Sequence, residues 1–244
     1  MRNFKIWERG AIALASFGVA AVMLATGPVR AAEDDQLFTM LKVDELEYRA
    51  SNRKDTYNWD AEGWIGEDYN KLWLKTEGER LVDGKVESAE VQALYSRLIS
   101  TFFDVQAGVR YDFKPVPKRT FGVLGVQGLA PYFFEVDAAS FVSDHGEVSG
   151  RLKASYDLLF TQRLILEPSF ETNIALQSVK ERGVGSGIND VGLSARLRYE
   201  IFREFAPYIG VNYERKLGQT ASYAKDEGEE PDNLSFVVGL RFWF

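Results

Sequence analysis

The sequence contains no cysteine and very little histidine or methionine. Without cysteine the chain can form neither a disulfide bond nor a thiolate that acts as a nucleophile or metal ligand. Histidine occurs once, at His145, and methionine occurs three times, at Met1, Met23 and Met40. Because imidazole and thioether groups are so few, a site built from several of them is excluded.

Long apolar runs are also missing, with one exception at the N-terminus. Residues 11–25 are apolar, three basic residues precede them, and small residues around Ala31 follow them. This is the three-part pattern of a secretory signal peptide, and the run is shorter than the about 20 apolar residues of a membrane-spanning helix. The sequence predicts a signal peptide over residues 1–31 and a short periplasmic segment over residues 32–40.

Basic side chains are scarce in the remainder of the chain. The whole sequence has 29 basic and 36 acidic residues, and residues 1–32 hold four of the former and one of the latter. The mature chain therefore carries 25 basic and 35 acidic residues, a net charge of −10. Nucleic acid is excluded as a partner, because phosphate binding needs a basic face.

What the chain does have is strict alternation of apolar and polar residues. Two long runs between Glu147 and Gln177 show it most clearly, with Leu152 on one face and Arg151 and Lys153 on the other. A period of two is typical of a β-strand. Strands of soluble proteins usually have about 5–6 residues, whereas tilted membrane strands need about 9–11. The length of these runs favours an outer-membrane barrel over a soluble sandwich.

Twelve segments with this character follow one another over residues 41–244. We therefore predict an all-β fold, a transmembrane antiparallel up-and-down β-barrel of twelve strands. The alternation is weak in the first and sixth segments, and it assigns no faces to residues 122–128. The predicted strands are residues 41–49, 57–66, 70–79, 86–97, 102–113, 119–128, 132–142, 147–160, 163–177, 188–202, 205–217 and 233–244.

The connections between these segments support the same architecture. Those after the even-numbered strands are short, whereas residues 178–187 and 218–232 form long loops after the ninth and eleventh strands. Outer-membrane barrels have short periplasmic turns and longer extracellular loops, so the first and last strands of the predicted barrel both have their chain terminus on the periplasmic side. The last strand alternates up to Phe244, similar to the signal read by the barrel-assembly machinery. The lipid bilayer is the expected surrounding, with aromatic side chains near the strand ends.

Charged residues on the polar faces are predicted to point into the lumen. Acidic residues on the seventh and ninth strands flank basic ones on the eighth. We favour a ladder of cross-strand ion pairs that fills the lumen, and the alternative is a path that binds or guides cations. The predicted lumenal residues are Lys75, Glu77, Glu90, Glu135, Asp137, Arg151, Lys153, Asp157, Glu167, Glu171, Arg196, Arg198 and Glu200.

Two further features could carry chemistry. His145 lies in a polar turn with Ser143 and Ser149 nearby in the sequence, so an outer-membrane lipid hydrolase is one hypothesis. No nucleophile motif surrounds either serine, and a turn residue is the favoured interpretation of His145. The acidic run 226–232 is predicted to be a solvated extracellular loop, or alternatively to gather divalent cations near lipopolysaccharide.

Four segments carry a resemblance to a known family. They are NKLWLKTEGE at residues 70–79, GVRYD at 108–112, GVQGLAPYFFE at 125–135 and LLFTQRLILEP at 158–168. They are similar to the outer-membrane copper resistance protein B family, and the resemblance covers residues 41–244. It implies a cell outer-membrane protein of copper homeostasis, without catalysis of its own, that acts beside a periplasmic multicopper oxidase.

The resemblance also implies that copper is the ligand. Family members commonly carry a Met- and His-rich N-terminal region, which this chain lacks. The available copper ligands are then the carboxylates Glu135, Asp137, Glu167 and Glu171, together with His145 and Met40. The alternative function is a general small-solute pore or a structural barrel without metal specificity.

Overall fold

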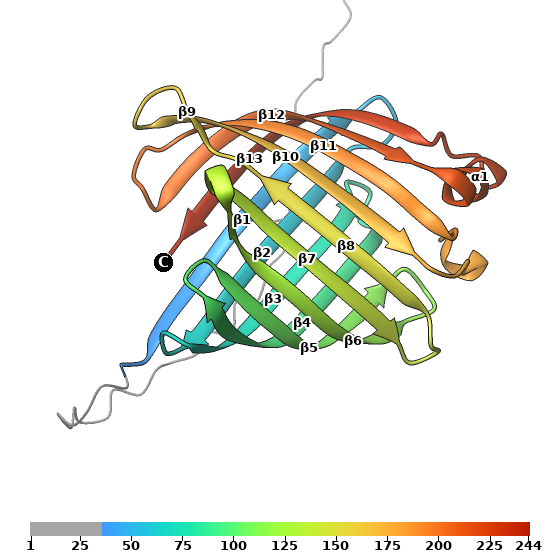
Figure 1. The fold of residues 1–244 in the computed structure, drawn as a ribbon. Helices are drawn as coiled ribbons and strands as arrows, with labels where there is room; N and C mark the ends of the chain where they lie inside the picture. The colour runs from blue at the N-terminus through green and yellow to red at the C-terminus, as the bar shows by residue number, and fades with distance from the viewer. Residues whose placement is uncertain (1–35) are drawn as a thin grey trace, which may run out of the picture. The chain divides into compact units, whose positions relative to one another are not determined.

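The computed structural model describes residues 36–244, so the predicted signal peptide and residues 32–35 lie outside the described part of the chain. The described residues form a closed antiparallel β-barrel of twelve strands with one extra two-residue strand, β9 (Leu158–Leu159), which confirms the predicted twelve-stranded fold (Figure 1). The strands are β1 (Phe38–Ser51), β2 (Thr56–Gly66), β3 (Asn70–Leu81), β4 (Val86–Ser100), β5 (Phe103–Lys114), β6 (Arg119–Ala130), β7 (Phe134–Ser143), β8 (Val148–Ser155), β9 (Leu158–Leu159), β10 (Leu164–Ala175), β11 (Gly187–Tyr199), β12 (Phe205–Lys216) and β13 (Asp232–Trp243).

Neighbouring strands of the chain are neighbours in the sheet, and the ring closes where β1 pairs with β13. Among residues 36–244, the closure leaves only the two-residue β9 unpaired along one edge, whereas an open sheet of such long strands would expose its edges to pairing with other chains. The short helix α1 (Gly218–Asp226) lies in the loop between β12 and β13. Across residues 36–244, no helix is both long and apolar enough to cross a membrane.

The alternation of the sequence places apolar side chains on the outside of the barrel. On β3, Leu72 and Leu74 are 58% and 57% exposed, whereas Trp73 between them is 6% exposed. In a water-soluble protein this arrangement would leave a large apolar surface unfavourably exposed. Lipid is the solvent that suits such a belt. Other outward apolar residues are Leu41, Val109, Leu124, Leu193, Ile209, Phe236 and Val238.

The interior holds a small apolar cluster beside its many charges. Trp73, Leu94, Phe121, Val123 and Phe141 pack together on the inner faces of β3, β4, β6 and β7. Alternation assigned no faces to residues 122–128 because glycines occur on both faces of β6 there and Val123 of the cluster makes part of the inner face apolar. The inner face of β6 meets the cluster, and its outer face meets lipid.

The eighth predicted strand is wrong in one respect, since residues 147–160 do not form a continuous strand. They form β8 and β9, separated at Tyr156 and Asp157. Pro168 of β10 lies opposite the break, where its carbonyl oxygen accepts a hydrogen bond from the Tyr156 N–H at 3.1 Å. In a regular antiparallel ladder, the opposite residue would donate the second hydrogen bond of the pair. Proline has no N–H to donate, so the ladder is interrupted there.

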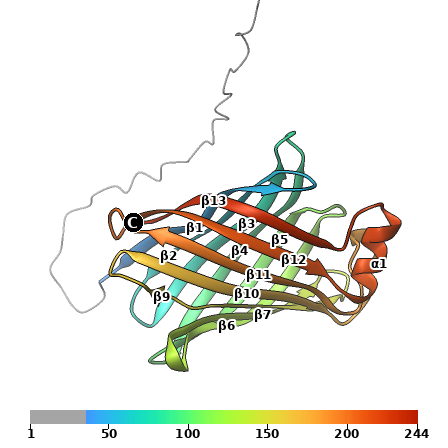
Figure 2. The same ribbon diagram turned by 90° about the horizontal axis from the view of Figure 1, so that it is seen from above.

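The two ends of the barrel differ. One end has the short turns and the C-terminus, and the other has α1 and the longer loops (Figure 2). The loop between β10 and β11 contains a short 3-10 turn at Lys180–Arg182, and the loop after β12 contains α1. Both loops were predicted without regular structure. Because outer-membrane barrels have short periplasmic turns and longer extracellular loops, we expect the end with the short turns to be periplasmic and the end with the long loops to face outward.

Close approach of neighbouring strands leaves no room for a Cβ at several glycines, of which Gly108 is an example. A Cβ on Gly108 of β5 would lie 2.1 Å from the Ala93 carbonyl oxygen of β4, whereas a Cβ on Gly122 of β6 would lie 3.9 Å from its nearest neighbour. We expect Gly108→Ala to lower the free energy of unfolding by about 1–3 kcal/mol and Gly122→Ala to change it far less. Urea unfolding in detergent followed by tryptophan fluorescence measures both. Equal losses would contradict the strand-spacing explanation.

Candidate functional site

The part of the lumen toward the short turns is a charged cavity of about 450 Å³, which we call the lumenal cavity. Met40, Leu129 and Glu135 line it near the short turns, and Glu90 and Arg151 line it near the middle of the barrel. Its lining has ten acidic and six basic side chains, an excess of four negative charges. They are Asp44, Glu45, Asp60, Glu62, Glu77, Glu90, Glu135, Asp137, Glu167 and Glu171, against Lys42, Lys75, Arg151, Lys153, Arg196 and Arg241.

A β-bulge in β1 contributes two of these acids. The register with β2 pairs Val43 with Ala61 and Glu45 with Asp60, so Asp44 is an extra residue between them. A bulge shifts the alternation by one position. Consecutive residues Asp44 and Glu45 therefore both line the lumenal cavity. This shift also explains why alternation in the first segment of the sequence was weak.

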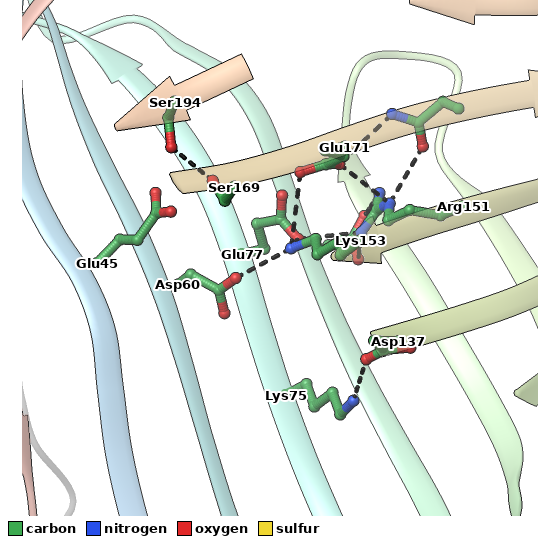
Figure 3. A network of polar contacts seen from close by, with 12 residues as sticks. Glu45, Asp60, Lys75, Glu77, Asp137, Arg151, Lys153, Ser169, Glu171 and Ser194 are labelled. Atoms are coloured by element: carbon green, nitrogen blue, oxygen red, sulfur yellow. Dashed lines mark hydrogen bonds and ion pairs between the residues drawn. The ribbon is translucent and has the colours of Figure 1, made fainter. Parts of the chain in front are cut away.

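Lys153 and Arg151 of β8 form the centre of the lumenal ion-pair network (Figure 3). The Lys153 ammonium lies 3.0 Å from Asp60, 2.8 Å from Glu77 and 3.9 Å from Glu171. The Arg151 guanidinium lies 3.0 Å from Glu77 and 3.6 Å from Glu171. These carboxylates come from β2, β3 and β10, so the network joins opposite walls of the barrel.

A second network lies where β1 meets β11 and β12 in the lumen. The Glu47 carboxylate accepts hydrogen bonds from Arg49 at 2.6 Å, from Arg196 at 3.0 Å and from the Tyr208 hydroxyl at 2.9 Å. The Glu47 side chain has no exposed surface. Glu45 also pairs with Arg196, at 2.7 Å. This network is buried and its central charge is compensated.

Ion pairing within the lumen was predicted, but most pairs reach across the cavity rather than to the adjacent strand. Asp137 of β7 lies opposite Lys153 in the β7–β8 register, yet it accepts from Lys75 of β3 at 2.7 Å. Ten of the thirteen predicted lumenal residues line the lumenal cavity. Of the remaining three, Arg198 pairs with Asp157 and also with Glu167.

The four predicted carboxylate ligands all line the lumenal cavity, but they are not gathered at one point. Asp137 pairs with Lys75, Glu167 with Arg198 and Arg241, and Glu171 with Arg151 and Lys153. Within residues 36–244, no group of three or more His, Asp or Glu side chains is arranged to hold a metal ion. The assignment of these residues as copper ligands stays a prediction.

The remaining two predicted ligands lie at opposite ends of the barrel. Met40 lines the lumenal cavity on β1. His145 lies in the outward turn after β7, where its Nδ1 is 2.9 Å from Asp144 Oδ1. This hydrogen bond holds the pKa of Asp144 below its usual range. The Ser143 hydroxyl accepts backbone N–H bonds from His145 and Glu147, at 3.1 and 3.0 Å.

A second, smaller cavity of about 230 Å³ lies toward the outer end, and we call it the outer cavity. Phe141 and Arg151 line both cavities and so mark the boundary between them. Arg110 and Arg151 both bind Glu90, at 2.7 and 3.0 Å. Both guanidinium groups also lie over the Phe141 ring, 4.7 and 5.8 Å from its centroid. We call Glu90, Arg110, Phe141 and Arg151 the divider.

Several side chains that point into the lumen were not predicted from the sequence. Asp60 and Glu62 alternate along β2 and could have been found by their period of two. Asp44, Glu45 and Glu47 were hidden by the bulge, which breaks that period. Arg182 lies in the loop after β10, and no pattern in the sequence indicates that its side chain reaches the lumen.

Comparison with known proteins agrees with this geometry. Residues 37–244 match the family described as "Copper resistance protein B precursor (CopB)". The chain is 44% identical over 214 residues to "Copper resistance protein B" of Escherichia coli, covering 88% of this chain and 72% of that protein. It is 44% identical over 211 residues to "Copper resistance protein B homolog" of Pseudomonas syringae pv. tomato, covering 86% and 71%.

Among solved structures, the fold is similar to that of the NanC porin. The TM-score is 0.55 and the sequence identity 11%, and the match covers 84% of this chain and 99% of that chain. At this identity the likeness concerns the fold alone. It agrees with the barrel architecture derived above.

Proposed function

The chain belongs to the copper resistance protein B family, and on that premise we propose that its barrel takes copper ions into the lumenal cavity and passes them across the membrane. The protein is located in the cell outer membrane, and its role is in copper resistance. The observation that carries the proposal is the excess of four negative charges in the lining of the lumenal cavity. Such a lining raises the local concentration of cations and disfavours anions.

The chemistry of the cavity lining supports passage of copper through the barrel rather than tight binding of copper within it. Carboxylates are poorer ligands for copper than imidazole or thiolate, and most of those in the lumenal cavity already contact a lysine or arginine. A conduit needs binding that is favourable enough for entry and weak enough for exit. The single thioether of the cavity, Met40, adds one ligand suited to Cu(I) at the periplasmic end.

We further propose that the barrel performs no catalytic step. In the alternative hypothesis it is a general small-solute pore or structural barrel, to which the same acidic lining would give cation preference without copper specificity. A periplasmic multicopper oxidase is the proposed partner at the end with the short turns, on the strength of family resemblance alone. Lipopolysaccharide is the proposed neighbour of the acidic loop 226–232.

Copper binding to the refolded mature protein tests the proposal, with Cu(II) and Cu(I) titrated separately in detergent. Within residues 36–244, Glu135 makes no ion pair, so Glu135→Gln changes the charge of the lumenal cavity without breaking a contact of that kind. We expect Glu135→Gln to weaken Cu(II) binding several-fold. The control Glu181→Gln removes an exposed charge from the outer loop and is expected to bind as the wild type does.

The titration also separates copper from other cations. Equal binding of Cu(II) and Mg²⁺ at the same concentration would favour the general cation pore. Absence of binding above a detergent control would overturn the copper proposal for this chain.

A further inference from the structure

The outer mouth of the barrel is crossed by the loop between β10 and β11, residues 176–186, which we call the strap. Arg182 in the strap donates a hydrogen bond to the Asp112 carboxylate of β5 at 2.6 Å. In the ring of strands β5 is separated from β10 by β6, β7 and β8 on one side, and a longer series lies on the other. The strap therefore does not fold back on its own strands. It reaches the far wall of the barrel.

The far contact of the strap is buried. The side chains of Asp112 and Arg182 are 1% and 9% exposed. The Arg182 guanidinium lies over the Phe121 ring, 5.6 Å from its centroid. Asp112 also accepts two hydrogen bonds from Arg110, at 2.7 and 3.1 Å, which links the strap to the divider.

Within the described part of the chain, the Arg182 guanidinium makes a short hydrogen bond through one nitrogen atom and no hydrogen bond through another. Its Nε atom is buried and has no hydrogen-bond partner among the described residues. A buried donor without a partner carries a desolvation penalty that a fully bonded guanidinium would avoid. The closed position of the strap is therefore less stable than a fully hydrogen-bonded guanidinium would make it.

The near end of the strap is braced by α1. Val179 and Val184 exchange two backbone hydrogen bonds, at 2.7 and 3.1 Å, and close the turn that carries Arg182. The Gly185 N–H then donates to the Thr220 hydroxyl of α1 at 2.9 Å. The strap is thus held firmly on the side of β11 and by one ion pair on the side of β5.

Arg182, Val179 and Val184 line the outer cavity, and the divider separates that cavity from the lumenal cavity. From these contacts we propose that the strap is a gate at the outer mouth and that the Arg182–Asp112 ion pair is its latch. When the latch is released, the outer mouth opens to small cations. The identity of copper as the cargo rests on the proposed function, whereas the gate itself does not.

Conductance of the mature protein in planar bilayers in potassium chloride, without copper, tests the gate. We expect Arg182→Ala to raise the mean cation conductance several-fold over that of the wild type. The matched control is Lys180→Ala, which removes an exposed cation from the same turn. The control is expected to conduct as the wild type does.

A second variant keeps the test valid if Arg182→Ala fails to fold. Replacement of residues 180–183 by a two-residue Gly-Gly turn keeps the bridge between Val179 and Val184 and removes the latch together with the tip of the strap. We expect it to reproduce the rise in conductance, with the β-sheet circular dichroism of the wild type retained. Wild-type conductance in both folded variants would overturn the gate. Because potassium is the probe, a failure of the gate and a failure of copper binding are distinguishable.

Discussion

Glu47→Gln is expected to lower the free energy of unfolding of the barrel by about 3–5 kcal/mol, because it removes a buried, paired charge. The Glu47 carboxylate is fully enclosed and accepts from Arg49, Arg196 and the Tyr208 hydroxyl. A glutamine keeps the shape of the side chain but removes one counter-charge from each of two guanidinium groups, for which Glu45 remains a partner. Removal of one partner from a buried pair is costly even where the intact pair adds little stability.

The matched control uses a less buried partner of the same arginine. Glu214 lies 2.7 Å from Arg49, but its side chain is 46% exposed. Water therefore compensates for its loss, and we expect Glu214→Gln to lower the free energy of unfolding by about 1 kcal/mol or less. Equilibrium unfolding in urea, followed by tryptophan fluorescence, measures both variants. Comparable losses would show that burial does not determine the contribution of this network.

Strand positions could be predicted from the sequence because membrane strands obey one simple rule. One face meets lipid and the other meets a wet lumen, so a period of two persists along the whole strand. The rule failed where a local feature broke the period. The bulge at Asp44 shifts the faces of β1, and Pro168 on β10 interrupts the strand opposite it.

The partners within the lumen could not be predicted by the same reasoning. Alternation assigns Lys153 to the inner face, but only the curvature of the closed ring brings it against Asp60 and Glu77 of β2 and β3. The register of adjacent strands gave the wrong partner for Asp137 for this reason. Arg182 lies in an irregular loop, where no periodicity indicates the direction of a side chain.

Lys153→Met is expected to make the stability of the barrel depend on divalent cations. The Lys153 ammonium contacts Asp60, Glu77 and Glu171, so its removal leaves three carboxylates with less counter-charge. We expect a lower free energy of unfolding than in the wild type without divalent cations. Added Cu(II) or Ca(II) is expected to restore about 2.7 kcal/mol at a concentration 100-fold above its dissociation constant, by binding the folded state.

Lys75→Met is the matched control, because the Lys75 ammonium forms an ion pair with one carboxylate, that of Asp137. A single carboxylate binds divalent cations weakly, so the control should regain much less stability than Lys153→Met when cations are added. An equal response of the two variants would contradict the role assigned to Lys153. The expected contrast bears on function, because an ammonium fixed among three carboxylates competes with any cation that arrives. In the proposed conduit, such competition keeps the binding of a cation in the lumen weak enough for the cation to leave at the far end.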